Sequence, residues 1–386
     1  MPIACVCGKL LPQLTGVSFI NIRSSRPQLC IQCQKTGQLV ASINSLSSNT
    51  NTKISNFSKN GSLSTQWAGS GLSPVDPFCI FSITKIIASG IPANKQTPVY
   101  ISLDGINAYT PVINILNDSS YEFSETGKIV FNGKVYVTSV RHIDNTSSRM
   151  AYSVNGILWL DSRMSVLDTI QDISSDGQRC LAIARNVGPM CSSDGISWSY
   201  IETLMNYNPN NYFSNTLSTG NKWFISACYD GNNCIYVSSD MVKWDLLVNI
   251  PSSTKFMKSN GKIILIGYDT SPFMQYSLDD GLTFIDLPFA SDVFPSGCND
   301  VAWNGSLWVA VASGINTIAT STDGITWNGL GNSIFTEAGI SICWNTTYWV
   351  AGGSGTNSMA YSTNGIDWVG AGTHLFTKIT TLCSLA

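Results

Sequence analysis

Four cysteines near the N-terminus stand in two close pairs, an arrangement that suits a tetrahedral metal site. One residue separates Cys5 from Cys7, two separate Cys30 from Cys33, and 22 residues lie between the pairs. Four thiolates in two such pairs can bind zinc. The first pair is tighter than the usual spacing, so two disulfides, or one disulfide with free thiols, are alternatives. A catalytic cysteine pair is not expected, because no thioredoxin-like β-α-β pattern surrounds it.

Six aspartates are the candidates for acid and base chemistry. A glycosidase needs two carboxyl groups about 5–10 Å apart, and we expect these aspartates at the surface or in turns instead: Asp161, Asp168, Asp172, Asp245, Asp286 and Asp300. The two histidines, His142 and His374, are far apart and have no partner pattern. We therefore assign no catalytic residue.

One segment has the composition of a sugar-binding loop. Residues 205–213 read MNYNPNNYF, in which Tyr207 and Tyr212 stand among several asparagines. Aromatic rings bind sugars by stacking against them. An ordinary connecting loop explains the same composition, so both interpretations stay open.

The composition favours an all-β chain with a polar but weakly charged surface. Only 12% of the 386 residues are charged and the formal net charge is −3, where about 25% charged residues is usual. No basic run is present, so nucleic acid is not an expected partner. We expect neither a membrane span, which needs roughly 18 consecutive apolar residues, nor a secretory signal, because the N-terminus lacks a long apolar core.

A motif that recurs along the chain must position these residues. It reads Ser, any residue, Asp or Asn, usually Gly, and then an aromatic residue, and we name it the Ser-x-Asp turn. The copies begin at Ser102, Ser153, Ser192, Ser238, Ser277, Ser321 and Ser362. Subtracting successive positions gives spacings of 51, 39, 46, 39, 44 and 41, which is the period of a four-stranded propeller blade.

Each residue of the Ser-x-Asp turn has a physical role. The carboxylate or amide accepts backbone N–H groups of its own turn, the glycine permits a backbone shape closed to other residues, and the aromatic ring packs beneath. The acceptors are Asp104, Asn155, Asp194, Asp240, Asp279, Asp323 and Asn364, and the aromatics are Trp159, Trp198, Trp244, Phe284, Trp327 and Trp368. Tyr109 lies one position late in the first copy, and Met241 replaces the glycine in the fourth.

A tight-turn dipeptide precedes an apolar strand upstream of most copies, as at Asn132-Gly133, Asn260-Gly261 and Asn304-Gly305. Both residues of such a dipeptide can adopt a positive φ, which favours a hairpin. The sequence thus predicts an all-β fold, a seven-bladed β-propeller of four-stranded antiparallel blades over residues 78–386. Residues 1–40 form a cysteine-containing segment, and residues 41–77 a linker rich in Ser and Asn.

The C-terminal strand is expected to close the ring. FTKITTLCSL, from Phe376, resembles FTEAGISICW, from Phe335, which begins the preceding unit. The C-terminus would then supply the inner strand of the first blade and remove an open sheet edge.

The seven copies resemble the Asp-box (BNR) repeats of sialidase-like propellers, and the resemblance covers about residues 78–386. It implies turns on the blade periphery with a structural role. The longer units, such as WNGSLWVAVASG before STDGITW, also resemble repeat proteins of large DNA viruses.

Sialidase activity, which this resemblance raises, requires three arginines, a tyrosine activated by a glutamate, and an acidic proton donor. Arg23 and Arg26 lie outside the predicted ring, and the last four units contain no arginine. The other five crowd into two adjacent units: Arg141, Arg149, Arg163, Arg179 and Arg185. A clamp drawn from spaced blades cannot be built in that way.

These features favour a non-enzymatic structural or protein-interaction propeller within a larger assembly, for which a virus particle is one candidate. Low charge suits a surface that neighbouring proteins cover. The eight cysteines outside the N-terminal segment, such as Cys79, Cys228 and Cys343, are expected as small buried residues. Many cysteines without evident partners suggest assembly in a reducing cytoplasm. A carbohydrate-binding propeller is the alternative, and a sialidase-like glycoside hydrolase is less favoured.

The cysteine pairs generate the first prediction. We expect the protein, purified under reducing conditions, to carry about one zinc ion per chain, because four thiolates complete a tetrahedral site. Metal analysis measures this content. Less than about half an equivalent would count against the four-thiolate site.

Overall fold

The computed structural model describes residues 86–92, 99–102, 110–111, 121–123, 128–142, 146–156, 158–204, 211–288, 290–373 and 376–384. They belong to one unit of the chain, Ile86–Leu385. The predicted N-terminal segment (1–40) with its four cysteines, the predicted linker (41–77), Asp104, Tyr109 and Tyr207 all lie outside the described residues.

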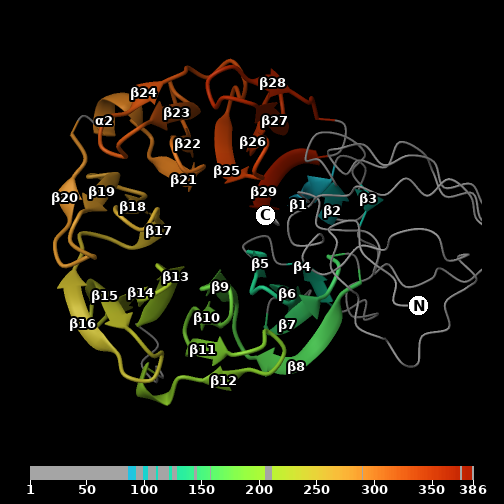
Figure 1. Ribbon diagram of the computed structural model, residues 1–386, viewed down its shortest axis with the longest axis vertical. Coiled ribbons are helices and arrows are strands. Elements are labelled where there is room, and N and C mark those ends of the chain that lie inside the picture. The colour runs from blue at the N-terminus through green and yellow to red at the C-terminus, as the bar shows by residue number, and fades with distance from the viewer. Residues whose placement is uncertain are drawn as a thin grey trace, which may run out of the picture. The chain divides into compact units, whose positions relative to one another are not determined.

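The described residues form six antiparallel sheets that follow one another around a common centre (Figure 1). Four of these sheets have four strands each. They are β9 (Ile170–Ser175), β10 (Cys180–Ala184), β11 (Gly188–Ser192) and β12 (Ser199–Tyr200); β13 (Tyr212–Ser218), β14 (Trp223–Tyr229), β15 (Asn232–Ser238) and β16 (Asp245–Asn249); β17 (Thr254–Ser259), β18 (Ile264–Tyr268), β19 (Met274–Ser277) and β20 (Ile285–Asp286); and β21 (Cys298–Trp303), β22 (Trp308–Ala312), β23 (Ile318–Ser321) and β24 (Asn328–Gly329).

The other two sheets are larger. One has five strands: β4 (Tyr121–Phe123), β5 (Val130–Phe131), β6 (Tyr136–His142), β7 (Ser148–Ser153) and β8 (Leu160–Val166). The other has eight: β25 (Ala338–Trp344), β26 (Trp349–Ser354), β27 (Met359–Ser362), β28 (Val369–Gly370), β29 (Phe376–Ser384), β1 (Ile86–Pro92), β2 (Val99–Ser102) and β3 (Thr110–Pro111). Two short helices, η2 (Glu202–Leu204) and α2 (Ala290–Val293), lie in connections between sheets.

The sheet count differs from the seven separate sheets that the repeats predict. The C-terminal strand β29 pairs with β1 over seven residue pairs. It also pairs with β26 at one point, Ser354 with Lys378. This single pair joins the strands β25–β28 to β29, β1, β2 and β3, so that the structure has one eight-stranded sheet in place of two smaller ones.

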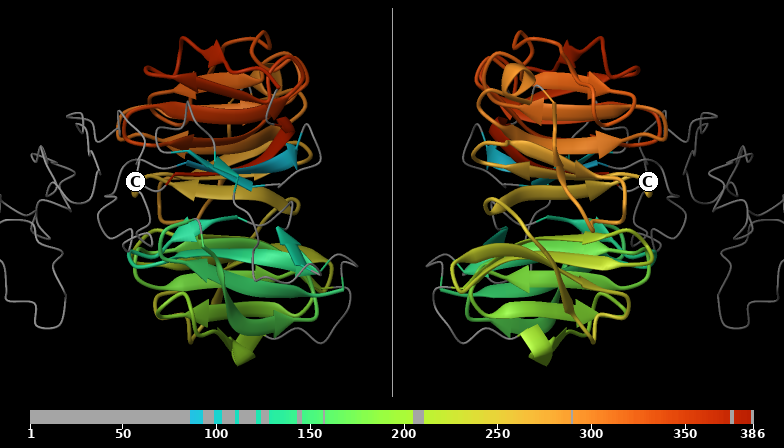
Figure 2. Two further views of the ribbon diagram at one scale, coloured as in Figure 1. Left: turned by 90° about the vertical axis from the view of Figure 1, so that its right-hand side faces the viewer. Right: turned by 90° about the vertical axis from the view of Figure 1, so that its left-hand side faces the viewer.

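The strands run along the axis about which the sheets are arranged, as the side views show (Figure 2). Strands β9, β13, β17, β21 and β25 lie nearest the centre, whereas β12, β16, β20, β24 and β28 lie at the periphery (Figure 1). Because each regular sheet is an antiparallel meander, its first and third turns lie at one end of the axis. The Ser-x-Asp turns are these third turns.

The core lies between the sheets. Phe256 and Met274 of one sheet share a buried cluster with Val301 and Trp308 of the next. Corresponding clusters join the other successive sheets. A four-stranded sheet has two apolar faces and cannot bury both by itself, so stacking of neighbours provides the burial that drives folding.

The upstream hairpins differ in detail from the expected two-residue turn. Gly305 has a φ of 103°, but Asn304 is not among the residues of positive φ. The Asn304 side chain instead accepts the backbone N–H of Ser306 at 2.9 Å and of Leu307 at 2.7 Å. The asparagine therefore acts as a side-chain acceptor in a four-residue loop between Trp303 and Trp308.

The glycine of the Ser-x-Asp turn generates the second prediction. Gly365 has a φ of 77°, and a Cβ there would lie 2.8 Å from Leu307 Cδ2 and 3.1 Å from Trp349 Nε1. We expect Gly365→Ala to destabilise the protein by about 2–5 kcal/mol, since backbone strain and overpacking add. Urea or thermal unfolding measures the change.

Gly261→Ala is the matched control. Gly261 has a φ of 83°, and a Cβ there would meet nothing within 4 Å. The Gly261→Ala variant should therefore lose only about 1–2 kcal/mol of stability, from backbone strain. Equal losses for the two variants would contradict the steric role of the glycine beneath the turn.

Candidate functional site

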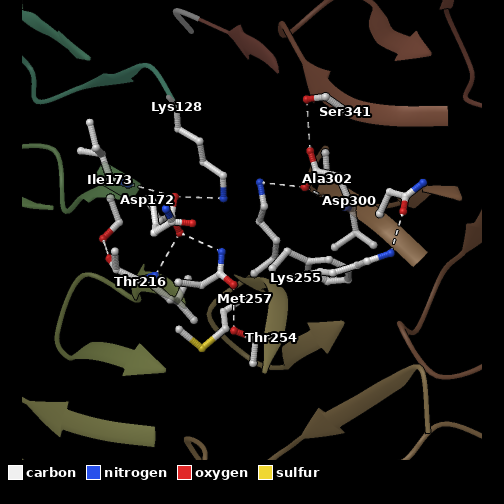
Figure 3. A pocket seen from close by; sticks show the side chains of 18 of the residues that line it. Lys128, Asp172, Ile173, Thr216, Thr254, Lys255, Met257, Asp300, Ala302 and Ser341 are labelled. Atoms are coloured by element: carbon white, nitrogen blue, oxygen red, sulfur yellow. Dashed lines mark hydrogen bonds and ion pairs between the residues drawn. The ribbon is translucent and has the colours of Figure 1, made fainter. Parts of the chain in front are cut away.

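The centre of the unit holds a cavity of about 880 Å³, which the inner strands line (Figure 3). Strands β9, β13, β17, β21 and β25 each contribute side chains to its wall. Successive inner strands also contact one another around the centre. The cavity is therefore the place where residues from many repeats converge.

Each of these five inner strands has a β-bulge near its start, where the pairing with the second strand shifts by one residue. A bulge leaves one residue unpaired and redirects its side chain. All five extra residues line the cavity, and they are Gln171, Ser214, Lys255, Asn299 and Ile340. Subtracting successive positions gives 43, 41, 44 and 41, which matches the period of the repeat.

Asp172, the residue after the first bulge, braces its sheet against the next. Its side chain is only 1% exposed and lies 3.0 Å from the Lys128 ammonium group. It also accepts the Thr216 backbone N–H at 2.9 Å and the Asn215 amide at 3.3 Å (Figure 3). Because Asn215 and Thr216 belong to β13, the carboxylate ties two successive inner strands together.

Asp300 occupies the equivalent position on β21 and makes equivalent contacts. It accepts the Ile342 backbone N–H at 3.2 Å and the Ser341 hydroxyl at 3.4 Å, both from β25 (Figure 3). The Lys258 ammonium lies 3.2 Å away. Burial disfavours the charged form of Lys258, but Asp300 and then Asp172 raise its pKa above the ordinary value. Both central carboxylates thus have a lysine partner.

Other inner strands are braced by uncharged groups. The Thr254 hydroxyl donates to Asn215 Oδ1 at 2.7 Å, which joins β17 to β13. The Leu382 backbone N–H donates to Ser341 Oγ at 3.0 Å, which joins β29 to β25. A belt of polar contacts therefore links successive strands around the cavity.

These contacts correct the expectation that Asp172 and Asp300 lie at the surface or in turns. The other four aspartates lie away from the cavity wall. Asp161 pairs with Arg149 and Asp245 with Lys243. Asp168 accepts backbone N–H groups of a turn, and Asp286 accepts the Gln275 amide. Two carboxylates do converge, but as braces with lysine partners rather than as a free acid and base.

Only one of the arginines that the structure describes, Arg185, lines the cavity. Its guanidinium carbon lies 5.4 Å from the centre of the Tyr212 ring. Tyr212, from the predicted ligand loop, begins β13 and also lines the cavity. Its partner in that loop, Tyr207, lies outside the described residues. Within the described residues the cavity therefore has one guanidinium and not the three of a sialidase clamp.

The Ser-x-Asp turns lie away from the cavity and are held by their own hydrogen bonds. In the copy at Ser321, the serine hydroxyl donates to Asp323 Oδ1 at 2.9 Å and accepts the Gly324 N–H at 2.8 Å. Asp323 accepts two further backbone N–H groups at 2.8 and 2.7 Å. The Trp327 indole donates to the Gly324 carbonyl at 3.1 Å, and this bond holds the indole beneath the turn.

The serine-to-acceptor bond recurs in five other described copies, namely Ser153 with Asn155, Ser192 with Asp194, Ser238 with Asp240, Ser277 with Asp279, and Ser362 with Asn364. The indole-to-carbonyl bond recurs at Trp159, Trp244 and Trp368. Trp198 and Phe284 pack against core clusters. Of the first copy, the structure describes only Ser102, at the end of β2.

Two copies depart from the common form of the turn. Met241 has a φ of 66° in the glycine position, and its N–H still donates to Ser238 at 2.8 Å. The copy at Ser277 has one extra residue, Asp280, with a φ of 58°. There the Gly281 N–H donates to Ser277 instead. The hydrogen-bond pattern is therefore kept at the expense of backbone strain.

The part of the chain that the structure describes contains no group of three metal-ligating side chains. Cys180, Cys228, Cys234 and Cys298 are buried, and burial raises the pKa of Cys180 to about 12. A thiol with so high a pKa is a poor nucleophile and a poor metal ligand at neutral pH. The predicted zinc site at Cys5, Cys7, Cys30 and Cys33 lies outside these residues.

Known proteins resemble the chain in fold alone. No protein-family model and no curated protein matches the sequence. A candidate 6-phosphogluconolactonase from Bacteroides uniformis has 13% identity and a TM-score of 0.54, with 78% of this chain and 99% of that chain covered. One from Bacteroides fragilis has 8% identity and the same TM-score, with 81% and 100% covered. Virginiamycin B lyase from Staphylococcus aureus has 11% identity and a TM-score of 0.51, with 67% and 89% covered.

These similar structures are β-propellers, and the six antiparallel sheets around one centre match that fold. At such low identity the similarity carries no information on activity. Among the described residues, no helix is both long and apolar enough to cross a membrane.

The Ser-x-Asp turns generate the third prediction, on pH dependence. Hydrogen bonds from the Thr283 side chain and backbone lower the pKa of Asp279 to about 2. A carboxylate whose pKa is lowered in the folded state stabilises the fold at pH values above its unfolded pKa of about 3.9. This stabilisation is lost as the pH falls through the folded pKa. As the pH is lowered from about 4 to about 2, the melting temperature of Asp279→Asn should therefore fall less than that of the wild type.

Asn155→Asp is the reciprocal control, because Asn155 holds the same position without a titrating group. This variant should gain the acid dependence that Asp279→Asn loses. Melting temperatures that follow the same course in both variants would show that the turn carboxylates do not couple to folding.

Proposed function

We propose that this chain is a non-enzymatic propeller that binds other proteins through its periphery, as one component of a larger assembly. The observation that carries the proposal is the position of the exposed apolar side chains. We define the rim as the Ser-x-Asp turns with the outermost strands β8, β12, β16, β20, β24 and β28. Exposed apolar groups contribute favourable free energy to binding when a partner removes them from water.

Large apolar side chains are exposed at fourteen described positions, and ten of these positions belong to the rim. The other four are Phe131, Leu167, Tyr229 and Ile315, so most of the exposed large apolar side chains lie on the rim. The ten rim residues are Val154, Leu158, Leu160, Val242, Leu246, Leu278, Leu282, Ile285, Ile366 and Val369.

The rim residues are unevenly distributed among the sheets. Five of them belong to two successive sheets, and we name them the rim patch: Val242, Leu246, Leu278, Leu282 and Ile285. The turn at Gly281 packs against the neighbouring outer strand, because its Cβ position lies 3.3 Å from Leu247 Cδ2. Lys222 and Asp280 form an ion pair at 3.1 Å across the same boundary. The two halves of the patch therefore form one surface.

Enzymatic alternatives receive less support from the cavity. A glycoside hydrolase needs one protonated and one free carboxyl group, whereas Asp172 and Asp300 each have a lysine partner and backbone donors. The polar groups in the cavity suit binding better than hydrolysis, so a carbohydrate-binding propeller is the stronger alternative. The proposal includes two further points: the repeats are of the Asp-box family, and a virus particle is one candidate for the assembly.

We further propose that the propeller has seven blades and that the C-terminal strand completes the first. Strands β29, β1, β2 and β3 would form this blade, with β25–β28 as the seventh. The seven residue pairs between β29 and β1, against one between β29 and β26, support this division. Pairing of β29 with β1 would remove an exposed sheet edge.

The rim patch generates the fourth prediction. Leu278→Asp combined with Leu282→Asp should release the chain from its native assembly, because each change introduces a charge that would have to be desolvated in the interface. The measurement is co-sedimentation of the tagged chain with the assembly isolated from its own source, compared with the wild type. We expect a loss of about tenfold or more in the bound fraction.

Ile315→Asp is the matched control. Ile315 is 63% exposed and lies between β22 and β23, away from the rim. This variant should stay bound, which excludes a general effect of added charge. Retention of the double rim variant, or robust turnover of sialosides or pooled polysaccharides by the wild type, would overturn the proposal.

A further inference from the structure

Strand β16 is an outer edge that lacks the usual protection of such edges. It lies at the periphery (Figure 1) and pairs with β15 on one side only. It has five residues, whereas the outer strands β12, β20, β24 and β28 have two each. Short outer strands are one way in which proteins prevent pairing between edges. The length of β16 leaves its edge open to a further strand.

Among the outer strands of the rim that the structure describes, only β8 is longer, and it is interrupted. Ser162, Arg163 and Met164 of β8 stand opposite Met150 alone. Arg163 has a φ of 63°, which a regular strand excludes. In β16 the register has a single extra residue, Leu247, and no residue has a positive φ. A second strand can therefore follow β16 but not β8.

The backbone groups of Asn249 point away from β15 and are available to such a strand. The Ile250 N–H donates to the Asn233 carbonyl of β15 at 2.9 Å, so Ile250 faces inward. Backbone groups of successive residues in an antiparallel strand face opposite sides. Asn249, which precedes Ile250, therefore presents its N–H and C=O outward.

Leu246 presents its backbone groups outward as well, as a comparison with the next sheet shows. There the Leu287 N–H donates to β19 at 3.1 Å, so that Asp286, the residue before it, faces outward. Asp286 pairs with Gln275, two residues before the serine of its turn. Leu246 pairs with Tyr236, which holds the same place in its own sheet. The edge of β16 thus has two outward positions.

Exposed apolar side chains flank the edge on both faces of the sheet. Leu246 pairs with Tyr236, which packs toward the preceding sheet, and its side chain is 58% exposed on that face. Leu282 belongs to the rim-patch turn that contacts Leu247 from the next sheet, and it is 60% exposed. Side chains of an added strand would point alternately to the two faces. Apolar residues on that strand would therefore cover both leucines.

The charge beside the edge is negative. Two lysines nearby already have aspartate partners: Lys222 with Asp280, and Lys243 with Asp245. Among the described residues, Asp240 and Asp279 of the two adjoining turns have no lysine or arginine partner. Hydrogen bonds within the turns lower the pKa of both carboxyl groups, so both are ionised at neutral pH. A partner with basic side chains is favoured here over an acidic one.

From these features we propose that the edge of β16 binds an extended segment of a partner protein that adds as a further strand and carries apolar and basic side chains. This inference rests on the proposed function, because it uses the rim patch as the binding surface, and it names the chemistry of the partner. Main-chain hydrogen bonds to Leu246 and Asn249 would supply affinity. Contacts of the side chains with the leucines and with Asp240 and Asp279 would supply specificity.

Removal of the two unpaired charges tests the fifth prediction. Asp240→Asn combined with Asp279→Asn should keep both turns, since asparagine holds the same position at Asn155 and Asn364. We expect the bound fraction in co-sedimentation with the native assembly to fall by about tenfold or more. The wild type should bind more weakly as salt rises, and the variant should depend less on salt.

The matched control makes the same two exchanges in turns outside the rim patch. Asp194→Asn combined with Asp323→Asn removes equal charge from equivalent positions. This variant should bind as the wild type does. An equal loss in the two double variants would overturn the proposal, because the charge effect would then not be specific to the edge of β16.

Asn249→Pro tests the addition of a strand. Proline removes only the outward N–H of Asn249 and leaves the inward bond of Ile250 in place. We expect a loss of about tenfold in the bound fraction, with an unchanged melting temperature.

The variants separate this inference from the proposed function. Release by Leu278→Asp with Leu282→Asp, but retention of Asn249→Pro or of Asp240→Asn with Asp279→Asn, would overturn the inference and leave the proposed function standing. Retention of the leucine variant would overturn the proposed function itself.

Discussion

Every narrow sheet in this protein has two apolar faces, and neither can be left in water. A four-stranded sheet lacks the means to cover itself, so each buried cluster is shared by two successive sheets. Trp308, for example, is buried in the cluster that contains Phe256 of the preceding sheet. Aromatic residues of this size contribute much of the apolar burial. The arrangement around a centre follows, because every sheet requires a neighbour on both sides.

Bringing the inner strands together creates a second problem, which is polar. The inner strand of a regular sheet pairs with a neighbour on one side only, so its other edge presents backbone groups that need partners. Asp172 and Asp300 provide these partners across the boundary between sheets. A buried carboxylate is costly unless it is paired, and Lys128 and Lys258 supply that pairing. These structural roles explain why both central carboxylates already have lysine and backbone partners.

The sequence predicts what recurs in residue type and misses what recurs only in position. Ser321, Asp323 and Trp327 were recognisable because the same types return in most units, and each has a local hydrogen-bonding role. The bulges return with the same period but carry Gln, Ser, Lys, Asn and Ile. Their period was available in the sequence, yet nothing in residue type marks it. Asp172 and Asp300 were missed because their partners lie about 40 residues away in the next unit.

This contrast also indicates where function resides in a repeat protein. Positions that keep one residue type in every unit serve the frame, since each unit meets the same physical demand. Positions that the frame places identically but fills differently are free to vary with a ligand or a partner. Lys255 holds a bulge position that Ser214 and Asn299 hold in other sheets. Leu278 and Ile285 occupy rim positions where another sheet has Thr322 and Asn328. Under the proposed function, we therefore expect departures from the repeat, rather than the repeat itself, to define the surfaces that bind a partner.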